Sequence, residues 1–309
     1  MPPCVGKSHF IFNLIKRKAW PTEKDDDDAN EPINFENTTY GGMAYSFSSD
    51  DSLILGNYQK SLATNFSPIV WSSTGVNQNI TFDNTTHPGY ATGFNSFNSL
   101  ICGNYQKSLV ITPFPIVWNA TGINQNIDFE NTTYGGSANS FSSDNMKICG
   151  YYRNSDYNDF PIVWDASGLN QNIDFENTTG GGYAIGFNSH NTLICGSYYS
   201  SNNLFPIVWD ASGLNQNINF ENTTYGGEAV SFSSDNMKIC GYYKNSSNKL
   251  FPIVWDASGI KQNINFENTT YGGSALSFSS DNSRICGYYK NSSNKFFPIV
   301  WDAVSGKQL

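Results

Sequence analysis

The sequence predicts an all-β fold, a six-bladed β-propeller of four-stranded blades. Three observations support this. A Pro-Ile-Val-Trp segment occurs six times at intervals of 45–47 residues, each copy contains four short strand-like stretches, and the last copy is completed by residues near the start of the chain. A period of this length indicates a repeated supersecondary unit. The six segments end at Trp71, Trp118, Trp164, Trp209, Trp255 and Trp301.

The fifth copy illustrates the four expected strands. Residues 229–233 alternate small and large side chains, as a half-buried strand does. Residues 238–243 are rich in β-branched and aromatic side chains, and residues 251–255 carry a proline only at the strand entrance. A fourth strand is expected within residues 260–266.

The two ends of the chain predict that the ring closes. The sixth copy stops at Leu309, before the Asn-Ile-Asn-Phe motif that ends the other copies, and the segment from Ile33 to Phe35 supplies the missing piece. We therefore expect the N-terminal segment near residue 33 to pair with the C-terminal blade, which removes exposed sheet edges. A β-solenoid is the alternative. No apolar stretch has helical periodicity, so helical solenoids are excluded.

The chain divides into residues 1–32, a leader or linker, and residues 33–309, the six repeats. The leader is expected to be mostly disordered with one short helix, and it ends in an acidic run at residues 25–28. Its apolar run, residues 10–15, is too short to span a membrane and leads to no cleavage site. These features predict neither a signal peptide nor a membrane span, and they favour an intracellular or virion-associated location.

Composition limits the classes of partner and suggests a buried core. A formal net charge of −9 argues against nucleic-acid binding. Five cysteines share one repeat position, which Leu55 fills in the first copy, so that position favours a small buried apolar side chain over a disulfide. The repeated tryptophans are expected in the core between blades; six sugar-stacking platforms are the alternative. The cysteines are Cys102, Cys149, Cys195, Cys240 and Cys286.

A family resemblance follows from the sixth copy. Its pattern is Ala275, Phe278, Ser279, Asp281, Ile285, Gly287, Tyr288 and Trp301, and the pattern recurs over residues 33–309. It resembles the HAF-type repeat, a family described as extracellular repeats with propeller architecture. The family's His-Ala-Phe run is replaced here by Phe-Pro-Ile. The asparagine bias and the near-identical copies are similar to repeat proteins of giant viruses.

A candidate binding face follows from the expected order of strands. Loops after the second and fourth strands are predicted to share one face, and these loops carry a repeated Asn-Thr-Thr motif, an acid in each copy and several lysines. The acids are Glu36, Asp83, Glu130, Glu176, Glu221 and Glu267, and the lysines are Lys244, Lys249, Lys290 and Lys295. A cation site within the acidic ring is one interpretation. Solvated carboxylates, partly paired with lysines, are the interpretation that we favour, so no metal is predicted.

No catalytic constellation is visible. His87 and His190 are predicted on opposite faces, and a symmetric ring of acids gives no reason for one raised pKa. Copies two and four replace Ser-Phe-Ser-Ser by Gly-Phe-Asn-Ser. We therefore predict a non-enzymatic, monomeric scaffold without cofactor that binds an unidentified protein. A glycan-binding, lectin-like propeller on a virion or cell surface is the alternative.

Overall fold

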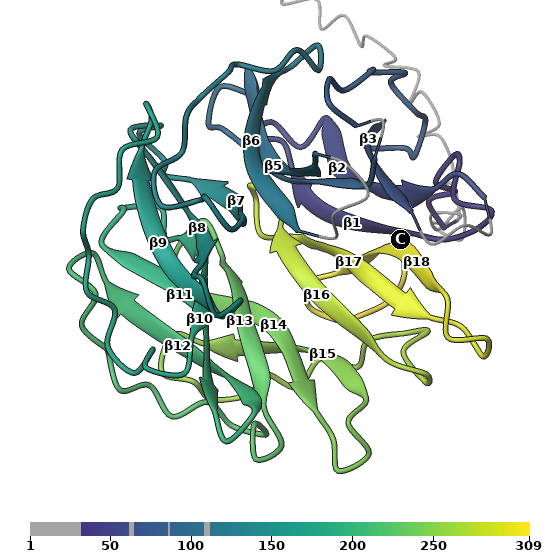
Figure 1. The fold of residues 1–309 in the computed structure, drawn as a ribbon. Coiled ribbons are helices and arrows are strands. Elements are labelled where there is room, and N and C mark those ends of the chain that lie inside the picture. Colours follow the sequence, from purple (N-terminus) through teal and green to yellow (C-terminus); the bar gives the residue numbers. More distant parts are fainter. Residues whose placement is uncertain (1–31, 62–64, 86, 108–111) are drawn as a thin grey trace, which may run out of the picture. The chain divides into compact units, whose positions relative to one another are not determined.

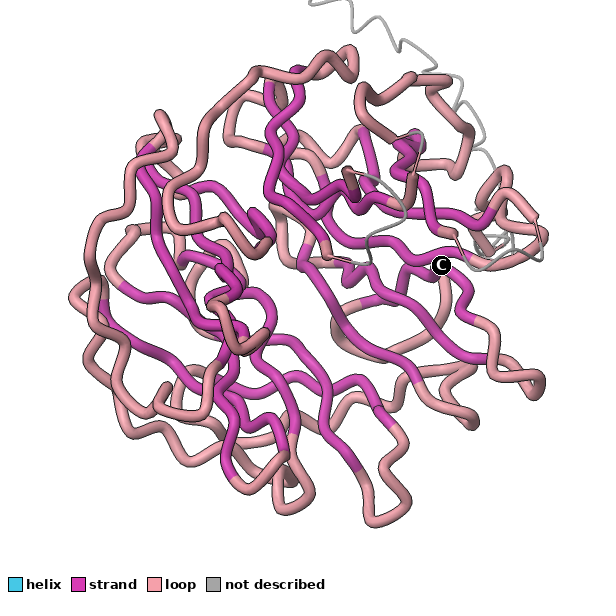
Figure 2. The backbone as a smooth tube through the Cα atoms, in the orientation of Figure 1, coloured by secondary structure: helices cyan, strands magenta, loops and turns pink. Residues whose placement is uncertain are grey.

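A computed structural model describes residues 32–61, 65–85, 87–107 and 112–309. Within these ranges the protein consists of strands and loops without a helix (Figure 2). Residues 32–309 form one compact unit. The leader predicted over residues 1–32 lies almost wholly outside the described residues.

Eighteen strands form six antiparallel sheets of three, each in sequence order. The first strands of the six sheets are β1 (Gly42–Phe47), β4 (Gly89–Phe94), β7 (Gly136–Phe141), β10 (Gly182–Phe187), β13 (Gly227–Phe232) and β16 (Gly273–Phe278). The second strands are β2 (Leu53–Gln59), β5 (Leu100–Gln106), β8 (Lys147–Arg153), β11 (Leu193–Ser200), β14 (Lys238–Lys244) and β17 (Arg284–Lys290). The third strands are β3 (Phe66–Ser72), β6 (Pro113–Asn119), β9 (Asp159–Asp165), β12 (Asn203–Asp210), β15 (Leu250–Asp256) and β18 (Phe296–Asp302).

The sheets follow one another around a common centre, and the sixth sheet lies beside the first (Figure 1). The first strands are innermost: β1 contacts β4, and each following first strand contacts the next until β16 contacts β1 again. This cyclic order of contacts is the arrangement of blades in a propeller.

The prediction of four-stranded blades is wrong. In every copy the expected fourth strand makes only an isolated bridge to the tryptophan of the third strand, as between Asn77 and Trp71. The Asn77 and Asn79 side chains hydrogen-bond to each other, and Asn79 has a φ of 53°. The first four copies share these features, and since such local bonds compete with a β-ladder and left-handed backbone ends a strand, their fourth segment leaves the sheet after one pair.

The core lies between neighbouring blades and is built from the repeated residues. Trp301, for example, packs with Phe266 of the preceding segment and with Cys240 and Val254 of the fifth blade. The six tryptophans of the repeat are fully buried, and each indole N–H donates to a main-chain carbonyl. The five cysteines of the repeat are buried and free. The structure thus places both sets in the core between blades.

One glycine position explains how the tryptophan fits. A Cβ on Gly241 would collide with the Glu228 carbonyl oxygen and come within 3.1 Å of the Trp255 ring. The indole therefore lies directly over the second strand, where any side chain would displace it. This explains why a glycine follows the repeat cysteine in copies two to six. In the first copy Leu55 replaces the cysteine, but the glycine, Gly56, is retained.

Contacts between the sixth and first blades join the two ends of the ring. The Ile33 N–H donates to the Leu309 carbonyl at 2.8 Å, a single hydrogen bond rather than a paired strand. Phe35 of the N-terminal segment packs with Trp71 and with Cys286 of the sixth blade. The predicted contact between the chain ends therefore exists, although it adds no strand.

A second set of contacts runs around the ring through the turns between first and second strands. In five junctions a serine N–H donates to an asparagine of the next turn, as from Ser143 to Asn191 at 2.8 Å. At the sixth junction the acceptor is Asp51, which receives the Ser280 N–H and lies 3.7 Å from Arg284. The junction between the chain ends is thus the one with a charged acceptor.

The variant of copies two and four has a physical explanation in these turns. In the first copy the Ser48 hydroxyl accepts from Leu53 N–H and donates to Asp50, whose carboxylate accepts the Ser52 N–H. In copy two Asn95 alone accepts from both equivalent N–H groups, those of Ser99 and Leu100. The aspartate is then not needed, and Phe97 and His190 stand in its place. Nothing in the structure explains the accompanying glycines.

Candidate functional site

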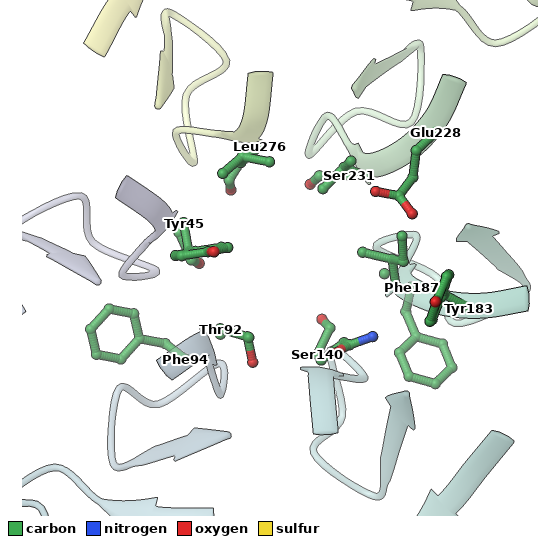
Figure 3. A pocket seen from close by; sticks show the side chains of 16 residues that line it. Tyr45, Thr92, Phe94, Ser140, Tyr183, Phe187, Glu228, Ser231 and Leu276 are labelled. Atoms are coloured by element: carbon green, nitrogen blue, oxygen red, sulfur yellow. The ribbon is translucent and has the colours of Figure 1, made fainter. Parts of the chain in front are cut away.

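The candidate site is a cavity at the centre of the ring, and a repeated backbone irregularity creates it. Every pairing of a first with a second strand contains a β-bulge, as between Ala44 and Ser46. A bulge leaves one residue unpaired and redirects its side chain. The six bulged residues line a cavity of about 310 Å³ (Figure 3). They are Tyr45, Thr92, Asn139, Ile185, Val230 and Leu276.

The residues two positions before the bulged residues form a second layer of side chains on the innermost strands. At this position copies three and six have serine opposite a tyrosine of the second strand, as Ser137 opposite Tyr151. Copy four reverses the pair, with Tyr183 opposite Ser197. Each of these blades therefore places one tyrosine at this level, from either strand. Copy five differs, because it pairs Glu228 with Tyr242.

Glu228 is the carboxylate of the cavity. It is half-buried in the wall, and Ser197 donates a hydrogen bond of 2.8 Å to its Oε1. Burial raises the pKa of Glu228 to about 7, although the Ser197 hydroxyl and the charge of Lys244 act in the opposite direction. Glu228 is therefore close to half-ionised at neutral pH, and its charge in turn helps to raise the pKa of Tyr242.

Tyr183 lies beside Glu228 on the neighbouring inner strand (Figure 3) and is held by a polar network. Its hydroxyl donates to the Asp159 carboxylate at 3.0 Å and lies 3.0 Å from the Tyr199 hydroxyl. Since a phenol has one proton, Tyr199 is the donor in the second bond. Asp159 also receives two hydrogen bonds from Arg153, at 2.7 and 3.1 Å, so its charge is balanced.

The opposite part of the channel is apolar. Met43, Leu276 and Tyr288 form a buried cluster, against which Tyr45 and Tyr90 pack. These residues come from the sixth, first and second blades, whereas Glu228 and Tyr183 come from the fifth and fourth. The channel lining is thus asymmetric, with a polar side and an apolar side.

The predicted acids have a structural role in the blades. Each accepts the backbone N–H of the residue that bridges to the tryptophan, as Glu130 Oε2 does from Asn170 at 2.9 Å. The acid's own carbonyl accepts the indole N–H of the same blade, here that of Trp164. These carboxylates are therefore arranged around the end of each third strand, and they do not converge on a common site.

The predicted lysines lie at the other end of the blades. Lys244 pairs with Leu250 at the start of β15, whereas the acids lie beside the residues after its end. Lys249 is 6.0 Å from the ring centre of Tyr271, and Lys290 is 4.9 Å from that of Phe296. The structure thus separates the two sets that the sequence placed on one face, because each Asn-Thr-Thr segment crosses from one end of the blade to the other.

The Asn-Thr-Thr residues themselves form turns along this crossing. The asparagine of each motif has a φ between 60° and 65°, in the left-handed region that asparagine tolerates. The second threonine of the first copy is followed by Tyr40 and Gly41, whose carbonyl accepts the Gln59 N–H at the end of β2. The motif therefore delivers the chain to the start of the inner strand.

The sequence reasoning missed the channel, and in particular Glu228. A signal existed: within the first strands, alanine is common to all copies, but the residues on either side of it differ from copy to copy. Positions that vary on an otherwise identical frame are those that the repeat does not need for packing. A carboxylate on one of six copies also breaks the symmetry that made a single raised pKa unexpected.

Other sites for chemistry are scarce in the described part of the chain. No group of three or more His, Cys, Asp or Glu side chains there is placed to hold a metal ion. Burial raises the pKa of the Cys102 thiol to about 12 and raises that of the other repeat cysteines, so these thiols are unreactive. The described residues also include no helix with the length and apolarity needed to cross a membrane.

Comparison with known proteins identifies the fold and no closer relationship. No family model and no curated protein matches the sequence. Among solved structures, TolB from Acinetobacter baumannii is similar over 87% of this chain, with a TM-score of 0.62 and 14% identity. The chain has a β-propeller fold. It spans 62% of the length of that TolB chain. A putative TolB from Agrobacterium tumefaciens has a TM-score of 0.52 and 9% identity, with 88% of this chain and 80% of that chain covered.

Proposed function

We propose that this propeller is a non-enzymatic scaffold that binds a partner protein at the face formed by the hairpins between second and third strands. The inner strands, which carry the cavity-lining residues, begin at that face, where Gly227 pairs with Tyr243 next to Lys244. One observation carries the proposal: the six bulged residues are six different amino acids on a frame that is otherwise nearly identical. A surface of unlike side chains on a rigid scaffold is a common basis of specific binding.

The lysines of this face support the proposal in part. Lys244, Lys249, Lys290 and Lys295 lie on these hairpins or at their ends. The predicted acids are not part of the proposed surface, since their carboxylates are bound to the backbone at the other end of each blade. Charged residues at a rim act mainly on association rate and partner choice.

The absence of catalysis stays a proposal that the channel lining supports. General acid–base chemistry needs two groups in reach of one substrate. Glu228 is the one carboxylate among the residues that line the cavity, no histidine lines it, and the hydroxyl protons of Tyr183 and Tyr45 are directed to Asp159 and Met43.

The experiment is an affinity capture from cells that produce the protein, with two charge-matched variants. The first replaces Lys244, Lys249, Lys290 and Lys295 by glutamate. The second replaces Lys147, Lys238, Lys261 and Lys307, which lie at the other end of the blades. We expect a protein that is captured by the wild type and by the second variant but lost with the first. Equal capture by both variants would contradict the proposed face.

A glycan-binding function is the second candidate, and one observation favours it. A cavity of about 580 Å³ lies against the third blade, lined by asparagines, threonines and the aromatic rings of Tyr152 and Phe160. Amide groups beside an aromatic ring are typical of sugar sites. The buried tryptophans are not available for stacking. A glycan array with the wild type and a Tyr152→Ala variant would test this cavity.

Membership of the HAF-type repeats, a giant-virus source, a monomeric state and an intracellular or virion-associated location stay predictions. Sedimentation of the purified chain would measure the oligomeric state directly.

A further inference from the structure

Glu228 is the one charged side chain among the residues that line the channel. The other lining side chains are neutral, and within the described ranges Glu228 forms no ion pair. Its Oε1 accepts a hydrogen bond of 2.8 Å from the Ser197 hydroxyl. A carboxylate enclosed by protein interacts strongly with a cation, because the surrounding dielectric constant is low.

An aromatic wall stands next to this carboxylate. Tyr183 directs its only hydroxyl proton to Asp159, and the Asp159 charge is already balanced by Arg153. The side of Tyr183 that lines the cavity is therefore its ring (Figure 3). Tyr45 contributes a second ring from the other side of the cavity. Aromatic faces attract cations and strengthen binding next to a carboxylate.

The rest of the lining selects among cations. Small hard ions such as Ca²⁺ need about six oxygen ligands, and no suitable cluster of acids occurs among the described residues. The bulged residues Ile185, Val230 and Leu276 instead offer apolar contacts. A cavity of about 310 Å³ is at the lower end of the size of ligand pockets, about 300–1,000 Å³, and suits one long side chain.

We propose that the channel takes up one lysine or arginine side chain of a partner protein, with Glu228 binding the cationic group and the bulged residues contacting the aliphatic stem. This inference rests on the proposed function, because it specifies the chemistry by which the scaffold recognises its partner. The net charge of −9 also favours a basic partner segment.

The test is an NMR titration of the whole chain at pH 8 with three blocked pentapeptides. Each has two glycines on either side of a central arginine, lysine or norleucine. We expect the arginine or the lysine peptide to bind at least about tenfold more tightly than the norleucine peptide, with shifts at channel residues. Equal binding of all three, or no binding of the basic peptides, would overturn the inference.

Two variants of Glu228 and one control test the role of the carboxylate. E228Q is isosteric, and E228S recreates the serine–tyrosine pair that blades three and six already contain, so both are compatible with the fold. Each is expected to weaken the basic peptides at least about tenfold. D156N removes an equal charge from an exposed hairpin of the same face and is expected to change binding less than twofold. A loss with D156N as large as that with E228Q would contradict specific recognition.

The pH dependence adds an independent readout. The groups around Glu228 are Ser197, Lys244 and the tyrosines at positions 45, 183, 242 and 288, with the Arg153–Asp159 pair behind Tyr183. With the pKa of Glu228 near 7, binding of a cation by the ionised form weakens about tenfold from pH 8 to pH 6. E228Q should abolish this dependence, and a slope that persists in E228Q would count against the carboxylate.

The two proposals fail in distinguishable ways. If the lysine-face variant abolishes partner capture while E228Q and the peptides have no effect, the scaffold proposal stands and the channel inference is wrong. If basic peptides bind through Glu228 but neither charge variant alters capture, the channel binds a basic group and the proposed face is wrong.

Discussion

The third strands and the first strands of the blades differ in what the repeat demands of them. The third strands are nearly identical, because each tryptophan fills the same space over a glycine and donates to the same carbonyl. The first strands share an alanine that is fully buried, but the bulged residue after it differs in every blade. Packing therefore determines the residues in the outer part of each blade, whereas it does not restrict the bulged residues that line the channel.

The largest expected effect on stability is that of removing a tryptophan from the outer part of a blade. Trp164→Ala removes a fully buried indole and its hydrogen bond to Glu130, and we expect a loss of about 3–5 kcal/mol in the free energy of unfolding. Ile185→Ala, at a half-buried bulged position, is expected to cost about 1 kcal/mol. Guanidinium unfolding would measure both. A similar cost at the two positions would break the distinction.

The second prediction concerns the stability cost of a channel carboxylate. The pKa of Glu228 is raised to about 7 from an ordinary value of 4.5, so the folded state binds the proton more tightly than the unfolded state. Its contribution to stability therefore falls as the pH rises from about 4.5 to 7 and stays low above that. Glu228→Gln should be more stable than the wild type by on the order of 2 kcal/mol at pH 8.

The same variant should match the wild type at pH 4, where Glu228 is protonated in both states. Urea unfolding at the two pH values provides the measurement. Glu221→Gln serves as a comparison, because its carboxylate accepts the backbone N–H of Lys261 in the outer part of the blade. A stability gain at pH 8 with Glu221→Gln as well would show that the effect is one of net charge.

The third prediction uses the two kinds of turn. Asn95→Ser alone keeps an acceptor for the Leu100 N–H, as Ser48 does for Leu53, but leaves the Ser99 N–H without one, at an expected cost of about 1 kcal/mol. Adding Phe97→Asp recreates the serine–aspartate pair of the first copy and should restore most of that loss. A double-mutant cycle measures the coupling. Additive effects would mean that the two residues vary independently.

The smallest effect is expected at the junction between the chain ends. Asp51→Asn keeps an acceptor for the Ser280 N–H and a residue that tolerates the left-handed turn, but it loses the charge near Arg284. We expect a loss below about 1 kcal/mol, because the pair is partly exposed. Thermal unfolding at low and high salt would show it, and a salt-independent loss would point to the turn instead of the charge.

Much of the fold was predictable from the repeat. The number of sheets, the three regular strands of each blade and the contact between Ile33 and Leu309 follow from the spacing and from the incomplete sixth copy. The absence of a fourth strand was not predictable. An alternating pattern of residues suggests a strand, but it does not show whether the backbone N–H groups of that strand find partners. Here the segment bonds to β15 only on either side of Lys261, through the Ile260 carbonyl and the Gln262 N–H, and the Ile264 N–H then bonds to the Gln262 carbonyl instead.

The sequence by itself determined the repeat, the sheets and the residues that fill the core, because these depend on periodic local patterns copied six times. Only the tertiary structure decided which residues meet at the centre. Glu228, Tyr183 and Tyr45 belong to different blades. The β-bulge that directs the bulged side chains into the cavity was not predicted from any sequence pattern. A channel is made by the closure of a ring, so its chemistry depends on residues far apart in the chain.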